Sequence, residues 1–197
     1  WATGYWPDGS LKWSAHSIGA QVPPAERYVL EPGTPAVPAT SLTVRDGAGQ
    51  VEIDTGVIRV VLPKRGPVLV RSISRGDRVV ARDGELVCLR SDGPGEETGT
   101  IRRERNGCLV ERVDVEQRGP VRAVVRIEGR HQKGRRHWLP FTVRLYLYAG
   151  SDGVRAVHTF VFDGNEKQDF ISGLGVRFTV PMSDELYNRH VRFAGTG

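Results

Sequence analysis

Apolar and polar residues alternate with a period of two along much of this chain, and this alternation limits the fold more than any other feature. In residues 121–128 the odd positions are apolar and most even positions are charged, so one face of an extended strand packs while the other meets solvent. Gly, Pro, Asp or Asn interrupt the pattern about every ten residues, and helical periodicity is almost absent. The sequence therefore predicts an all-β fold with a large antiparallel β-sandwich.

Strands are expected where the alternation is clearest. They cover residues 11–18, 41–45, 57–62, 69–75, 77–81, 86–90, 101–106, 109–117, 121–129, 139–149, 154–162 and 175–180. Residues 31–40 carry three prolines and no periodicity, which predicts an extended linker or a strap across a surface. We therefore expect two units, residues 1–45 and residues 46–197.

The charge balance narrows the class of partner. The chain has 28 Lys and Arg residues, only four of them Lys, against 23 Asp and Glu residues. Guanidinium groups bind carboxylates and phosphates well. The arginines could therefore bind acidic polysaccharide or nucleic acid, or only form a solvated surface. Signatures of nucleic-acid-binding folds are absent, and no apolar run approaches the ~20 residues of a membrane span. We expect no nucleic acid and no membrane as partners.

The potential metal ligands form no recognisable site. Cys88 and Cys108 lack the spacing of zinc ligands. A disulfide between them is one alternative, and two buried free thiols are the favoured one. Residues 162–170 gather three acids and an Asn without the spacing of an EF-hand loop. A polar connection is therefore expected there, and neither a metal nor a cofactor is expected.

Two tryptophans flank a turn near the start of the chain. Pro7 followed by Asp8 and Gly9 suits a tight turn between extended segments, which would place Trp6 and Trp13 close together across a hairpin. A structural hairpin is favoured, and a sugar-stacking surface that includes Trp13 is the alternative.

A run of positive charge lies between two of the clearest strands. Residues 130–137 end in Arg136 and His137, which predicts a basic hairpin tip. Such a tip could bind a polyanion with an affinity that falls as salt rises. A merely solvated tip is the favoured alternative.

The end of the chain carries the residues that best fit chemistry. Tyr187, Asn188, Arg189, His190 and Arg192 lie within six positions. In an extended chain the even-numbered ones share one face, where a guanidinium could hold a carboxylate and an imidazole could take a proton. Those groups are what β-elimination from a uronic acid needs. A strand edge rich in Arg and His without a catalytic role is the alternative.

On these motifs the chain resembles the exo-rhamnogalacturonan-lyase-like proteins. Residues 4–13 look like the hairpin near the end of the N-terminal RIFT-type β-barrel of that family, and residues 54–60 are similar to the opening strand of its central β-sandwich. Residues 173–178 and 186–195 add to the resemblance. It implies the tail of the barrel and a linker in residues 1–45. It also implies most of the sandwich, of the galactose-mutarotase-like supersandwich type, in residues 46–197.

The resemblance further implies a secreted polysaccharide lyase that cleaves rhamnogalacturonan-type pectic polysaccharide. Its partners would be acidic polysaccharide or oligosaccharide and a C-terminal α/α toroid domain of the same chain, without which we expect the isolated sequence to be inactive. The catalytic candidates are His190, Arg189, Arg192 and Tyr187, and the substrate-binding candidates are Asn188, Arg136, His137 and Trp13. The alternative is a non-catalytic carbohydrate-binding or structural module.

Overall fold

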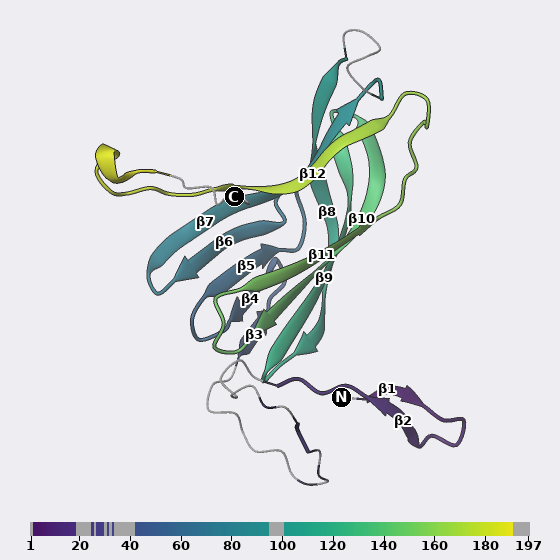
Figure 1. Ribbon diagram of the computed structural model, residues 1–197, viewed down its shortest axis with the longest axis vertical. Helices are drawn as coiled ribbons and strands as arrows, with labels where there is room; N and C mark the ends of the chain where they lie inside the picture. The colour runs from purple at the N-terminus through teal and green to yellow at the C-terminus, as the bar shows by residue number, and fades with distance from the viewer. Residues whose placement is uncertain are drawn as a thin grey trace.

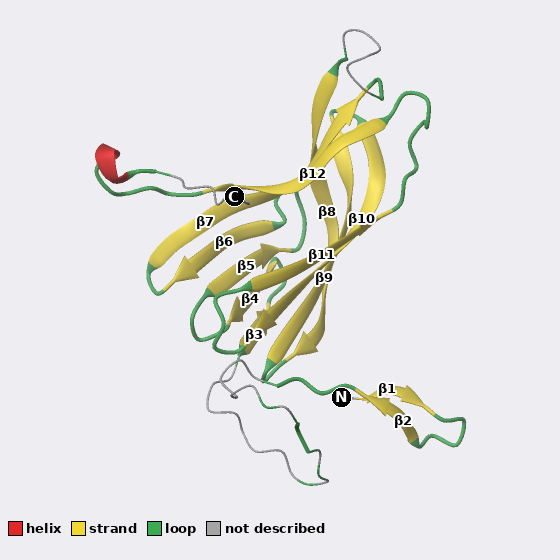
Figure 2. Cartoon of the chain, viewed as in Figure 1, coloured by secondary structure: helices red, strands yellow, loops and turns green. Residues whose placement is uncertain are grey.

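Strands and turns make up nearly all of the computed structural model, which describes residues 2–18, 25, 27–29, 31, 33, 42–94 and 101–190. Figure 2 shows one short helix in this part of the chain, the 3-10 turn Leu186–Asn188. No described helix is long and apolar enough to span a membrane. The predicted all-β class is confirmed.

The described residues form twelve strands. These are β1 (Ala2–Tyr5), β2 (Leu11–Ser14), β3 (Thr43–Asp46), β4 (Gln50–Asp54), β5 (Arg59–Pro63), β6 (Val70–Arg75), β7 (Arg78–Ser91), β8 (Arg103–Arg118), β9 (Arg122–Lys133), β10 (Arg136–Tyr148), β11 (Val154–Phe160) and β12 (Phe170–Thr179). β1 and β2 pair only with each other, and the other ten form one antiparallel sheet in the order β11-β10-β9-β8-β7-β6-β5-β4-β3, with β12 on β7 (Figure 1).

The large sheet folds over into a sandwich at β8. The first residues of β8 pair with β7 and the remainder pairs with β9, so β3–β7 with β12 form one layer and β8–β11 form the other (Figure 1). A bridge ties the layers together farther along β8: the N–H of Gly66 donates to the carbonyl of Val110 at 3.1 Å, and the N–H of Val110 donates back at 2.7 Å. The predicted β-sandwich is confirmed.

The alternation that predicted the sandwich also defines its core. Val125 and Ile127 of β9 and Val143 and Leu145 of β10 are buried between the layers; full burial of such side chains stabilises a fold by about 1.5–3 kcal/mol each. On the outer face Tyr146 is flanked by arginines on both neighbouring strands, Arg122 and Arg155, whose guanidinium carbons lie 5.8 Å and 5.5 Å from its ring centroid.

Two strands are longer than the sequence indicated. Residues 77–81 and 86–90 belong to the single strand β7, and residues 101–106 and 109–117 belong to β8. The expected breaks contain glycines that serve close packing. A Cβ on Gly84 would lie 2.5 Å from the Phe178 ring, and one on Gly107 would lie 2.4 Å from the Glu85 carboxylate. A glycine inside a strand thus marks a close approach here and not a turn. β4 was not among the expected strands.

Both cysteines are free and buried, the alternative that the sequence favoured. Cys108 packs in the main core, whereas Cys88 packs in a separate small cluster with Trp138 and Leu139. Burial raises the pKa of each thiol to about 11. Neither is therefore a nucleophile at neutral pH.

Candidate functional site

The segment with the predicted catalytic residues follows β12. Leu186–Asn188 form a 3-10 turn, in which the N–H of Asn188 donates to the carbonyl of Glu185 at 2.8 Å. The chain is therefore not extended at Leu186–Asn188, where local hydrogen bonds form the turn, whereas Arg189 has an extended backbone. Tyr187 is 83% exposed, and Asn188, Arg189 and His190 are exposed as well. Arg192 lies outside the described residues.

His190 has a defined orientation within this turn. Its Nδ1 lies 3.1 Å from the carbonyl oxygen of Asn188. Because a carbonyl can only accept, Nδ1 carries the proton of the neutral ring, and Nε2 keeps the lone pair. The neighbouring Arg189 donates its Nε–H to the carbonyl of Asp184. The turn thus presents a basic ring nitrogen and a guanidinium side by side along the chain.

Arg136, a predicted substrate contact, is already engaged within the fold. It donates to Asp169 Oδ2 at 2.5 Å, and its guanidinium carbon lies 4.7 Å from the centroid of the Trp138 ring. Arg90 donates to the other oxygen of the same carboxylate, which is only 3% exposed. Hydrogen bonding from Arg136 holds the pKa of Asp169 well below its usual range. His137, the next residue on β10, is exposed.

The expected polar connection between β11 and β12 is built around that carboxylate. The N–H of Asn165 donates to Asp169 Oδ2 at 2.7 Å, and Asp163 Oδ1 accepts the N–H of Leu139 at 2.6 Å. Leu139 adopts a positive φ of 45°, so Asp163 satisfies the backbone at an irregular point of β10. These acids serve the fold.

Trp13 lies on the predicted hairpin but not beside Trp6. Gly4 is its cross-strand partner, and a Cβ on Gly4 would be 3.1 Å from the Trp13 ring. Lys12 instead lies over Trp6, with Nζ 4.3 Å from the ring centroid. The two indoles make no ring contact with each other in the described hairpin, because Trp13 sits above a glycine. Trp13 is 65% exposed.

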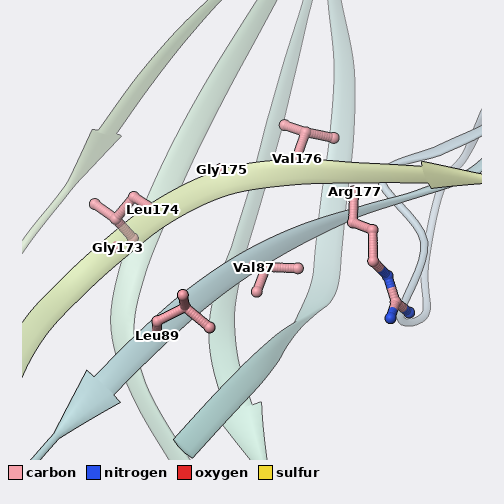
Figure 3. A pocket seen from close by; sticks show the side chains of 7 residues that line it. All are labelled: Val87, Leu89, Gly173, Leu174, Gly175, Val176 and Arg177. Atoms are coloured by element: carbon pink, nitrogen blue, oxygen red, sulfur yellow. The ribbon is translucent and has the colours of Figure 1, made fainter. Parts of the chain in front are cut away.

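An apolar hollow of about 230 Å³ lies where β12 pairs with β7 (Figure 3). Val87, Leu89, Leu174 and Val176 supply most of its lining, and Arg177 is the sole titratable lining residue among those described. Arg177 donates to Glu85 at 2.8 Å. The hollow therefore lacks groups for acid–base chemistry.

Two family models match this arrangement. The model of the PcRGLX-like protein central beta sandwich domain matches residues 42–197, and that of the PcRGLX-like N-terminal RIFT barrel domain matches residues 1–33. The chain belongs to the PcRGLX-like family. This membership confirms the resemblance to exo-rhamnogalacturonan-lyase-like proteins and the order of a RIFT barrel followed by a β-sandwich.

A relative from Bacillus subtilis (strain 168), the uncharacterized protein YetA, is 34% identical over 194 residues. The match covers 97% of this chain and 23% of YetA. The chain thus spans about a quarter of the length of this curated relative and corresponds to a PcRGLX-like module.

The PcRGLX-like sandwich also holds a buried histidine, His131, which lies in the run expected to form a basic tip, and a half-buried one, His158. His131 is fully buried, with Nδ1 3.2 Å from the carbonyl oxygen of Gly107, and its ring meets Phe141 edge-on at 5.5 Å. The His158 ring packs against both, with its centroid 6.0 Å from that of Phe141 and 6.1 Å from that of His131. Burial lowers the pKa of His131 to about 4 and lowers that of His158. His131 is therefore neutral at pH 7 and lies in the buried interior.

The structure also contains a basic cleft that the sequence did not reveal. It is lined by Ala48, Gly49, Pro63, Lys64, Arg65, Arg71, Glu111, Arg112 and Val113. The cations come from three separate stretches of the chain, so no compact motif marks them. The three cations within residues 64–71 were the only local signal.

Proposed function

We propose that the protein containing this chain is a polysaccharide lyase that cleaves uronate-containing, rhamnogalacturonan-type polysaccharide by β-elimination. Membership of the PcRGLX-like family supports the reaction class. The observation that carries the proposal is the hydrogen bond between His190 Nδ1 and the carbonyl of Asn188. It leaves a basic Nε2 on an exposed ring next to Arg189.

The proposed reaction uses three kinds of group. Arg189 or Arg192 pairs with the carboxylate of the uronic acid, which stabilises the negative charge that develops when the C5 proton leaves. His190 Nε2 accepts that proton as general base. The C5 electron pair forms the C4=C5 double bond while the C4–O bond breaks, and the phenol of Tyr187 donates a proton to the leaving oxygen.

Substrate positioning would involve further parts of the molecule. Asn188 lies next to these groups in the chain, and the exposed His137 and Trp13 remain predicted sugar contacts. Arg136 could contact substrate only with the part of its guanidinium that Asp169 leaves open, since its side chain is 41% exposed. A facing α/α toroid domain and secretion, both implied by the family resemblance, belong to this proposal.

The test is an assay of the full-length protein on rhamnogalacturonan, following ultraviolet absorbance of the unsaturated product. His190→Ala should lower kcat at least about 100-fold, the usual contribution of a general base. His16→Ala removes another exposed imidazole and should keep the wild-type rate. Wild-type turnover in His190→Ala would remove His190 from the mechanism. Binding without any unsaturated product would favour a non-catalytic carbohydrate-binding module.

A further inference from the structure

The basic cleft has a volume of about 380 Å³ and lies between the two layers of the sandwich, beside the Gly66–Val110 bridge. One side comes from the β3–β4 turn, the end of β5, and β6, and the other side comes from β8. Small-molecule sites commonly measure roughly 300–1,000 Å³. The cleft is therefore large enough for a small ligand.

Backbone hydrogen bonds hold the elements that carry the cations. The N–H of Lys64 donates to the carbonyl of Gly49 at 3.0 Å, which fixes the end of β5 against the β3–β4 turn. Gly66, with φ of 108°, then turns the chain so that it pairs with β8. Arg71 follows the buried residues Leu69 and Val70 on β6. The cations thus project from a fixed frame.

Two of the four cations in the cleft already have carboxylate partners. Lys64 Nζ lies 2.7 Å from Asp46, and Arg112 Nε lies 2.8 Å from Asp114. Glu111, the one carboxylate in the lining, is 3.8 Å from Arg130. The lining is consequently rich in positive charge. Its other two arginines take no part in these three ion pairs.

Arg65 and Arg71 are those other arginines. Both are exposed, and neither guanidinium has a hydrogen-bond or ion-pair partner among the residues that the structure describes. A guanidinium presents N–H donors in a fixed fork that matches the two oxygens of a carboxylate. The space in front of them is also open at the β3–β4 turn, where a Cβ on Gly49 would meet nothing within 4 Å.

We propose that this cleft binds a carboxylate-bearing oligosaccharide, with Arg65 and Arg71 donating to a carboxylate of the ligand. Glu111 and the peptide groups of the β3–β4 turn supply acceptors for sugar hydroxyl groups. The site is separate from the turn at His190, which follows β12 and not β5 or β8. The choice of an acidic saccharide as ligand rests on the proposed function, whereas the position of the site does not.

The experiment measures the affinity of the full-length protein for tetragalacturonate by calorimetry. This probe carries a carboxylate on every sugar and lacks the rhamnose of the proposed substrate. Arg65→Gln with Arg71→Gln should weaken binding at least about tenfold, because two charge-assisted contacts are lost. Arg75→Gln with Arg78→Gln is the matched control. It removes the same charge from two exposed arginines outside the cleft and should change the affinity less than about twofold.

The same affinity measurement is repeated at higher salt concentration and with other ligands. Raising the salt concentration should weaken binding of tetragalacturonate to the wild-type protein, and neutral maltotetraose should not bind. Wild-type affinity in the Arg65/Arg71 variant, or an equal loss in the control, would overturn the site. Inorganic phosphate binding as tightly as tetragalacturonate would overturn the saccharide as ligand. Failure of His190→Ala to lower turnover would refute the proposed base and leave these affinities unaffected, so the two proposals fail separately.

Discussion

Two pairs of arginines in this sandwich meet different surroundings. Arg90 and Arg136 share the carboxylate of Asp169, which is almost entirely buried. Arg65 and Arg71 line an open cleft and have no carboxylate partner within the described residues. The comparison shows that the fold, and not the residue type, decides whether an arginine ties strands together or stays available to a ligand.

Loss of the buried carboxylate should have the largest effect. Asp169→Asn leaves the partly buried Arg90 with only the more distant carboxylate of Glu104, 3.7 Å away, and weakens the acceptor of the Asn165 N–H. We expect the free energy of unfolding to fall by about 4 kcal/mol, measured by urea denaturation. Asp152→Asn affects an exposed pair with Arg75 at 4.0 Å and should cost under about 0.5 kcal/mol. Equal losses in both variants would contradict a structural role for the Asp169 cluster.

The second largest effect on the free energy of unfolding should appear at acidic pH. It arises from a buried histidine and not from the arginines. The pKa of His131 is about 4 in the folded protein and about 6.5 when unfolded, so the unfolded state binds the proton first. The free energy of unfolding should fall by about 3 kcal/mol as pH drops from 6.5 to 4.

His131→Phe should reduce that loss of unfolding free energy between pH 6.5 and 4. His16→Phe, at an exposed position, should leave the loss unchanged. Asp169 acts at lower pH, because its folded pKa lies below its usual value and its stabilisation is lost as pH falls through and below about 4. An unchanged slope between pH 6.5 and 4 in His131→Phe would show that another group titrates there.

Removal of one arginine from each pair should separate the two environments at neutral pH. Arg136→Gln takes a hydrogen bond from the Asp169 carboxylate and the cation from the Trp138 ring, so we expect a loss of about 2 kcal/mol. Arg71→Gln removes a guanidinium that has no partner among the described residues, and should change stability by less than about 0.5 kcal/mol. Thermal unfolding compares the two, and a larger loss in Arg71→Gln would reverse the assignment.

Much of the fold was predictable because most buried residues of β9 and β10 follow the apolar and polar alternation of the sequence. The lengths of β7 and β8 were not, since Gly84 and Gly107 look like turn residues in the sequence. Their role depends on Phe178 and Glu85, which approach from other strands. The contact that requires each glycine is tertiary and leaves no local signal.

The candidate sites show the same limit. Tyr187 and His190 were recognisable from the sequence because they lie close together in the chain, but the local hydrogen bonds that form the 3-10 turn at Leu186–Asn188 were not. The basic cleft draws Arg65 and Arg112 from elements that become neighbours where Gly66 meets β8. Such a site follows from the crossing of β8 between layers and not from spacing in the sequence.

The most direct test of this account is the gain in unfolding free energy that tetragalacturonate gives to each variant. At a ligand concentration about 100 times the wild-type Kd, the wild-type protein should gain about 2.7 kcal/mol. The control variant Arg75→Gln, Arg78→Gln should gain the same amount, and the Arg65→Gln, Arg71→Gln variant should gain about 1.4 kcal/mol or less. An equal gain in all three proteins would contradict the claim that Arg65 and Arg71 are the arginines available to a ligand.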